Sequence, residues 1–215
     1  MSVEKLEEYI AFADLTGLDA LLAQNPALAK KITSQQVSPL MLSCYYKKPE
    51  VSAVLLKYID EINLFEASAV GKFDVVAHLV YSHPNAVNLY APDGFTPLGL
   101  ACYFGQFEVA RYLVLKGADV NQPSNNGFRV FPIHSAAAGD YTDIARMLIE
   151  NGAQVNVKQQ AGSTPLHSAA QNGNLELLIL LIENGAETQV RMEDGKLPAD
   201  LAMEKGFEEI AEILS

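Results

Sequence analysis

The stretch STPLHSAA, residues 163–170, recurs in altered form along the chain. Its relatives are FTPLGLAC at 95–102, FPIHSAA at 131–137 and KLPADLA at 196–202. The four prolines in these stretches lie 35, 33 and 33 residues apart. A second marker, the dipeptide Gly-Ala, begins 20 residues after each of the first three prolines, at Gly117, Gly152 and Gly185. Two markers that keep one phase over three units indicate an internal repeat.

The residues of one unit predict two helices. Thr164 is expected to cap the first helix with its side-chain oxygen, and Pro165 suits the first helical position because an N–H has no partner there. Gly173 ends this short helix. Apolar residues at helical spacing over 175–182 predict a second helix that stops at Gly185. An extended stretch follows, and dipeptides such as Asp194-Gly195 favour tight hairpin tips.

This pattern resembles the ankyrin repeat, which has two antiparallel helices and a β-hairpin finger in about 33 residues. The resemblance implies a mainly α fold: a solenoid of about seven helix-turn-helix units with short β-hairpin fingers, in a single domain over residues 1–215. The match is best where Val-Asn follows Gly-Ala, at Val120-Asn121 and Val155-Asn156. The expected units are an N-terminal cap at about 4–33, then 34–59, 60–90, 91–124, 125–158 and 159–191, and a C-terminal cap at 192–215.

Two irregularities in the spacing are informative. Asn63 takes the proline position of its unit but follows Pro39 by only 24 residues. We therefore expect the finger between these units to be largely missing, with the helix pairs joined directly near residues 58–62. The 35-residue spacing places two extra residues in the polar loop 121–127, which is either a recognition element or a tolerated insertion.

The composition argues against several classes of protein. Among 215 residues, 15 are Lys or Arg and 26 are Asp or Glu, giving a net charge of −11. This charge argues against a nucleic-acid partner and against an anionic membrane surface. No stretch approaches the roughly 18 apolar residues of a spanning helix, and the first ten residues do not resemble a secretory signal. With two cysteines in the chain, we expect a soluble cytoplasmic protein.

The sequence offers no catalytic, cofactor or metal site. No phosphate-binding loop, nucleophile elbow or paired metal-ligand spacing occurs. His134 and His167 each lie two residues after a helix-start proline, and the resemblance implies a structural hydrogen-bonding role for them. Cys44 and Cys102 share the slot five residues after the helix start, so they are expected to be buried, about 20 Å apart and unbridged.

The resemblance implies that a partner protein binds along a concave face lined by the fingers and by the ends of the first helices. Counting from each proline places an aromatic stripe with one arginine on that face: Tyr45, Tyr46, Phe95, Tyr103, Phe104, Phe128 and Arg129. Exposed aromatic and Arg side chains are typical of binding hot spots. In the alternative interpretation, some of these rings fold inward and fill the space of the missing finger.

Most of the charge imbalance lies at the C-terminal end. Residues 176–215 hold 3 basic and 10 acidic side chains, a net charge of −7. The acidic patch of the expected cap comprises Glu204, Glu208, Glu209 and Glu212. These charges either keep a terminal unit soluble or attract a basic segment of the partner.

The predicted function is therefore non-enzymatic protein binding through the concave groove, as an adaptor, inhibitor or chaperone, by a chain that is a monomer when unbound. A structural or self-assembling spacer is the first alternative. An enzyme of unrecognised type is the second.

Overall fold

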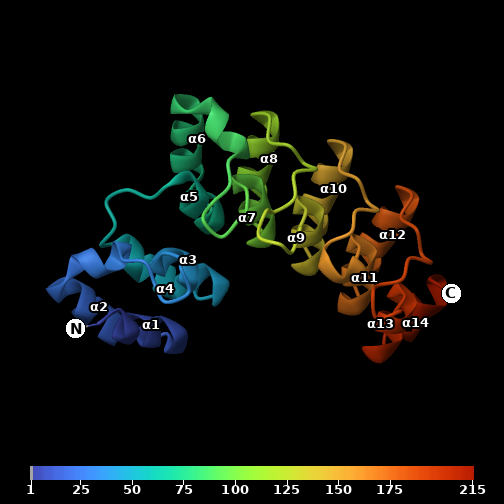
Figure 1. The fold of residues 1–215 in the computed structure, drawn as a ribbon, viewed down its shortest axis with the longest axis horizontal. Helices are drawn as coiled ribbons and strands as arrows, with labels where there is room; N and C mark the ends of the chain where they lie inside the picture. Colours follow the sequence, from blue (N-terminus) through green and yellow to red (C-terminus); the bar gives the residue numbers. More distant parts are fainter. Residues whose placement is uncertain (1) are drawn as a thin grey trace.

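The computed structural model describes residues 2–215 and consists of short helices arranged in pairs (Figure 1). The first helices of the pairs are α1 (Val3–Phe12), α3 (Pro39–Tyr45), α5 (Leu64–Val70), α7 (Pro97–Tyr103), α9 (Pro132–Ala138), α11 (Pro165–Asn172) and α13 (Pro198–Glu204). The second helices are α2 (Leu15–Gln24), α4 (Pro49–Leu56), α6 (Phe73–Ser82), α8 (Phe107–Leu115), α10 (Thr142–Glu150), α12 (Leu175–Glu183) and α14 (Glu208–Ile213). Short 3-10 turns add η1 (Pro26–Lys30), η2 (Pro84–Asn88) and η3 (Gln160–Gly162). The mainly helical prediction is confirmed, while the division into repeat units stays a prediction.

The first helices begin as the sequence predicts at most positions. The Thr96 hydroxyl accepts a hydrogen bond from the Gly99 N–H at 3.0 Å, ahead of Pro97. Asn63 accepts from the Glu66 N–H at 2.9 Å, and the Glu66 carboxylate accepts from the Asn63 N–H at 3.1 Å. This reciprocal pair satisfies two N–H groups that the helix leaves free, so Asn63 serves where α3, α7 and α11 have Ser or Thr before Pro.

The expected cap at Thr164 is wrong in its detail. The Thr164 hydroxyl lies 2.8 Å from Nδ1 of His167 and does not accept from a backbone N–H. His167 Nδ1 also accepts from the Thr164 N–H at 3.2 Å. The His167 imidazole therefore accepts from the N–H of the capping residue, as the Glu66 carboxylate does at Asn63.

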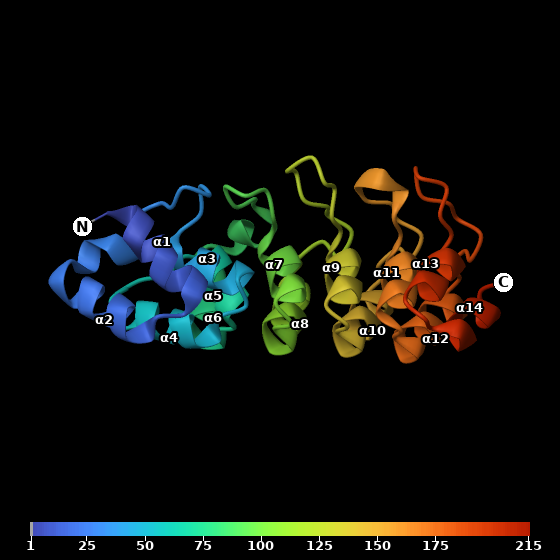
Figure 2. The same cartoon turned by 90° about the horizontal axis from the view of Figure 1, so that it is seen from below.

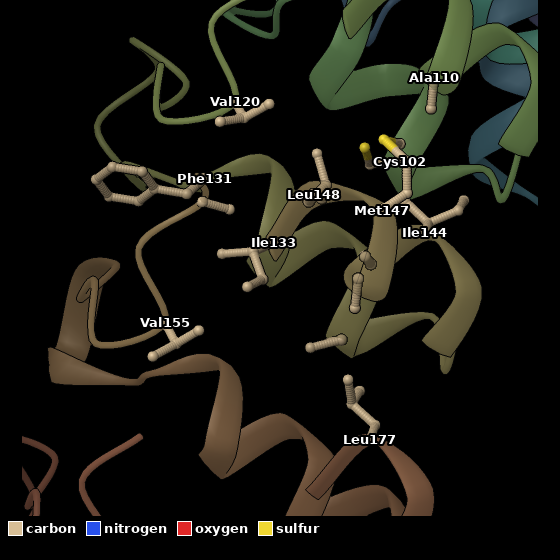
Figure 3. Close-up of a cluster of buried hydrophobic side chains, with 14 of the residues drawn as sticks. Cys102, Ala110, Val120, Phe131, Ile133, Ile144, Met147, Leu148, Val155 and Leu177 are labelled. Carbon is tan, nitrogen blue, oxygen red and sulfur yellow. The ribbon is translucent and has the colours of Figure 1, made fainter. Parts of the chain in front are cut away.

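The helix pairs follow one another in a row and form two layers (Figures 1 and 2). From α5 onward the first helices pack side by side, and α6, α8, α10 and α12 form the second layer. The core lies between the layers and between successive pairs. Figure 3 shows its middle part, with Ile133 on α9, Ile144 and Leu148 on α10, and Leu177 on α12 of the following pair. Burial of such side chains against both neighbours gives a repeat array its stability.

The core is divided near the N-terminal end. One cluster of buried side chains extends from Leu64 to Leu214, and a second extends from Leu6 to Leu55. A small third cluster contains Met41, Cys44, Ala69 and Leu100. The division falls where α4 ends at Leu56 and α5 begins at Leu64. Residues 57–63 join the two helix pairs without a finger, as the 24-residue spacing predicts.

Fingers are present between the later pairs and project to one side of the array (Figure 2). Each is closed by one backbone hydrogen bond, for example Ala91 N–H to Phe95 O at 2.8 Å and Gln159 N–H to Ser163 O at 3.0 Å. One bond is too few for a β-ladder, and residues 2–215 contain no assigned strand. The expected β-hairpins are therefore not confirmed. In the longer finger the closing bond runs from Ser124 N–H to Val130 O, two residues more than in the others.

Candidate protein-binding surface

Four residues of the predicted stripe form one aromatic cluster, comprising Tyr45, Phe95, Tyr103 and Phe104. Tyr103 lies at its centre, with its ring centroid 5.0 Å from that of Phe104 and 6.2 Å from that of Phe95. Tyr45 lies 5.4 Å from Phe104 and 6.1 Å from Tyr103. Ring pairs at these separations attract one another, so the cluster holds its shape without a partner.

The cluster has a packed side and an open side. Tyr45, Phe95 and Phe104 are half-buried and pack on the small third core cluster. These three rings therefore fold inward, as in the alternative interpretation. The Tyr45 hydroxyl donates to Asp93 at 2.7 Å, and burial together with this carboxylate raises the pKa of Tyr45. Tyr103 keeps 38% of its surface exposed. The cluster therefore presents one accessible ring on a rigid base.

The other three stripe residues lie outside this cluster. Tyr46 is 38% exposed, and its hydroxyl accepts a hydrogen bond from the Gln35 side chain at 2.7 Å. Phe128 is 58% exposed in the longer finger. The guanidinium of Arg129 lies 5.7 Å from the ring centroid of Phe131 and so faces its own finger. The structure thus divides the stripe into a cluster and three separate exposed groups.

Beside the aromatic cluster the chain forms a cleft of about 380 Å³, which we term the junction cleft. It lies between α4 and the C-terminal ends of the first helices α3, α5 and α7, with the turns that follow them. Its lining residues are Cys44, Lys47, Lys48, Pro49, Ser52, Ala53, Leu56, Ala69, Val70, Lys72, Tyr103, Phe104, Gln106 and Tyr141. Sequence reasoning missed its three lysines, although Lys48 and Lys72 occupy matching places after the first helices α3 and α5, and Lys47 precedes Lys48.

At the opposite end, the predicted acidic patch is only partly free. Glu204 forms an ion pair with Lys196 at 2.8 Å. Glu208, Glu209 and Glu212 are exposed on α14 and have no cation within ion-pair distance among residues 2–215. Three carboxylates on one six-residue helix form a local negative surface.

The two histidines have structural contacts. The buried His134 ring lies with Nε2 3.0 Å from the Ser163 carbonyl oxygen, and because that oxygen only accepts, Nε2 donates. Burial lowers the pKa of His134 to about 4, although the Ser163 carbonyl partly opposes this shift. His134 is therefore neutral at pH 7 and links α9 to the next finger, in agreement with the role that the resemblance implies.

The cysteines are free and buried, as expected. Burial raises the pKa of Cys44 to about 11 and raises that of Cys102 as well, so both thiols are protonated at neutral pH. Within residues 2–215 no three His, Cys, Asp or Glu side chains are grouped as ligands of a metal ion. The same residues include no helix with the length and apolar character needed to cross a bilayer.

Comparison with known proteins agrees with this architecture. The family model described as ankyrin repeats (3 copies) matches residues 64–159 and 133–215. The chain is 32% identical over 120 residues to alpha-latrocrustotoxin-Lt1a of Latrodectus tredecimguttatus, which covers 52% of this chain and 8% of the toxin. It is 35% identical over 103 residues to ankyrin repeat and SAM domain-containing protein 6 of Rattus norvegicus, covering 47% of this chain and 11% of that protein.

A third relative is smaller. Protein phosphatase 1 regulatory subunit 27 of Mus musculus is 30% identical over 105 residues, which cover 49% of this chain and 63% of that protein. The aligned parts thus span between 8% and 63% of these three relatives. Because the family model covers well over half of the sequence, with matching helix pairs in the fold, the chain belongs to the ankyrin-repeat family.

Proposed function

We propose that this chain is a non-enzymatic binding module that holds another protein against the groove beside its fingers, with Tyr103 as the central contact. The observation that carries the proposal is the aromatic cluster, which exposes Tyr103 on half-buried rings. Ankyrin repeats generally mediate protein–protein interaction, which supports the proposal. A side chain already fixed by its neighbours loses little entropy on binding, so more of its contact energy stabilises the complex.

The finer role is that of an adaptor, inhibitor or chaperone. One relative is by name a regulatory subunit of a phosphatase. A rigid surface acts on an enzyme by covering part of it, which makes inhibition the form that we test first. The partner's own activity, measured with and without this chain, distinguishes an inhibitor from a passive adaptor.

The binding surface is tested by capture of proteins from cells that express the chain. Tyr103→Ala is compared with Leu115→Ala, whose side chain is 74% exposed on α8 in the outer layer. We expect Tyr103→Ala to weaken capture by about tenfold or more, since an aromatic hot spot contributes about 2 kcal/mol or more. Leu115→Ala should bind like the wild type. Equal capture by both folded variants would show that the aromatic cluster is not the site.

The acidic end supplies a second contact in the proposal. Glu208, Glu209 and Glu212 are free to pair with a basic segment of the partner, whereas Glu204 is occupied by Lys196. Glu208→Gln/Glu212→Gln should weaken association more at low salt than at high salt, because salt screens exposed charges. Unchanged salt dependence would leave solubility as the role of these carboxylates.

We further propose that the unbound chain is a monomer in the cytoplasm. Light scattering, which measures the mass of the particle in solution, distinguishes a monomer from a self-assembling spacer. A mass of one chain at high concentration is the expected result, and concentration-dependent growth would favour the spacer.

A further inference from the structure

The junction cleft has a charge opposite to that of the whole chain. Lys47, Lys48 and Lys72 line it, and none of its lining residues within the described chain is acidic. None of the three lysines lies within ion-pair distance of a carboxylate in residues 2–215, although the chain has net charge −11. Lys72 also lines a neighbouring cavity that contains Asp60, Glu61 and Asp74, whereas Lys47 and Lys48 line the junction cleft alone. Three lysines without ion pairs give the cleft a local positive charge.

Lys47 occupies a strained backbone position. Its φ is 54°, in the left-handed region, at the place where the third, fourth, sixth and seventh pairs have glycine. Asp140 is another exception, with φ 60°, but its carboxylate accepts hydrogen bonds from Asn172 at 3.0 Å and Asn174 at 3.4 Å. The Lys47 side chain makes no hydrogen bond within the described residues. A strained residue without an internal contact points to a role outside the fold.

The remaining lining is largely apolar. Pro49, Leu56 and Val70 line the cleft together with the aromatic residues Tyr103 and Phe104. A ligand that fits this surface carries negative charge beside an apolar side chain. An acidic peptide segment with an adjacent Leu, Ile or Phe has that chemistry.

The helix pairs on the two sides of the cleft are also joined differently from the later pairs. In the later pairs an asparagine joins each finger to the next helix end, as Asn121 does by donating to Gly152 O and accepting from the Gln154 N–H, both at 2.9 Å. Residues 57–63 contain no finger, and no such asparagine link is present across this junction in the described chain. The two helix pairs that flank the cleft therefore lack a contact that the later pairs have.

We propose that the junction cleft binds an acidic segment of a partner protein, with carboxylates among Lys47, Lys48 and Lys72 and an apolar side chain against Val70 and Phe104. The inference rests on the proposed binding function and specifies its partner chemistry. Tyr103 belongs to both surfaces, so the segment in the cleft and the rest of the partner are continuous.

A displayed library of random twelve-residue peptides, selected on the full chain, tests the proposal. We expect the selected peptides to be enriched in Asp and Glu next to aliphatic or aromatic residues. One selected peptide is then titrated against the wild type, Lys47→Gly/Lys72→Ser and Lys158→Ser. Lys158 is exposed in a finger and is not among the cleft's lining residues, so it controls for a loss of net charge.

Binding should weaken about tenfold in Lys47→Gly/Lys72→Ser and remain unchanged in Lys158→Ser, since two charge contacts contribute about 1.4 kcal/mol or more together. Selected peptides without an acidic bias, no selected peptides, or equal binding by both variants would overturn the proposal. If Tyr103→Ala loses binding while Lys47→Gly/Lys72→Ser binds fully, the proposal that the cleft binds an acidic segment is wrong. The proposed protein-binding function would still hold.

Discussion

At the scale of single residues, the turn after each first helix holds either a glycine, which is unstrained there, or a residue with a side chain, which is strained. The turn after the helix needs a left-handed residue, and Gly71, Gly105, Gly173 and Gly206 supply it with φ between 71° and 80°. Glycine reaches this region without a steric penalty, whereas a residue with a Cβ is strained there by about 1–2 kcal/mol. Lys47 is such a residue.

Replacing Lys47 by glycine is expected to stabilise the chain. Lys47→Gly removes the strain but adds freedom to the unfolded chain, so the free energy of unfolding should rise by about 0.5–1 kcal/mol. Urea denaturation measures the change. Gly117→Ala is the matched control, because φ at Gly117 is 91° and nothing lies within 4 Å of an added Cβ. It should lose about 1–2 kcal/mol from backbone strain alone, and a destabilised Lys47→Gly would show that Lys47 is not strained.

His134 gives the chain a pH dependence of defined sign. Its pKa is about 4 in the folded chain against 6.5 for an ordinary histidine, so between these values the unfolded chain binds more protons. Stability is therefore lost as pH falls from about 6.5 towards 4, by about 2 kcal/mol between pH 7 and pH 5. His134→Gln keeps a donor for the Ser163 carbonyl and removes the titration. The loss between pH 7 and pH 5 should shrink in this variant, and an unchanged pH profile would rule out the neutral buried imidazole as its source.

At the scale of elements, asparagines couple each finger to the next helix pair. Asn88, Asn121 and Asn156 each donate to a glycine carbonyl and accept from a backbone N–H two residues later in the following unit, at 2.8–3.0 Å. The glycines are Gly117, Gly152 and Gly185, the same residues whose spacing marks the repeat. One side chain thus satisfies two backbone groups at a helix end, which fixes the distance between neighbouring pairs.

Removing one of these links should destabilise the array. Asn121→Ala leaves the Gly152 carbonyl and the Gln154 N–H without their partners, and we expect a loss of about 1–2 kcal/mol in the free energy of unfolding. Thermal or urea unfolding measures the loss. Asn85→Ala is the control, because Asn85 is exposed and its side chain has no hydrogen bond among the described contacts. Equal effects of the two substitutions would show that the link contributes nothing.

The sequence predicts the elements better than the contacts between them. The prolines, the Gly-Ala pairs and the position of Asn63 predict the helix starts and the missing finger, because each depends on a local backbone requirement. The role of the Thr164 hydroxyl is decided by the His167 ring beside it, and the rings of the stripe turn inward or outward according to which neighbours leave space. The position of a residue within its repeat does not say which neighbours leave space for its side chain. For this reason the sequence did not predict that three stripe residues lie outside the cluster, or that three lysines line the junction cleft.

At the scale of the whole molecule, the array has one weak junction. The core from Leu6 to Leu55 is separate from the core that starts at Leu64, and the two sides are joined by the small third cluster and by contacts such as Tyr45 with Asp93. In repeat proteins stability is approximately a sum over units and their interfaces, so the weakest interface is where the array opens.

Local opening should therefore begin in the first two helix pairs. We expect backbone amides of α1–α4 to exchange with deuterium faster than those of α7–α11, because their core is smaller and the link to α5 lacks an asparagine contact. Hydrogen exchange followed by mass spectrometry measures this order. A selected acidic peptide in the junction cleft should slow exchange in α3 and α4, and uniform exchange along the free chain would show that the junction is no weaker than the others.

Site-specific photo-crosslinking tests the central proposal, protein binding through the aromatic cluster, most directly. A photoreactive phenylalanine is placed at Tyr103 in one protein and at Tyr81 in another, since Tyr81 is 84% exposed on α6 in the outer layer. Irradiation in cells that express the chain should give a discrete higher-mass adduct from position 103 and none from position 81. Adducts from position 81 alone, or from neither position, would contradict binding at the aromatic cluster.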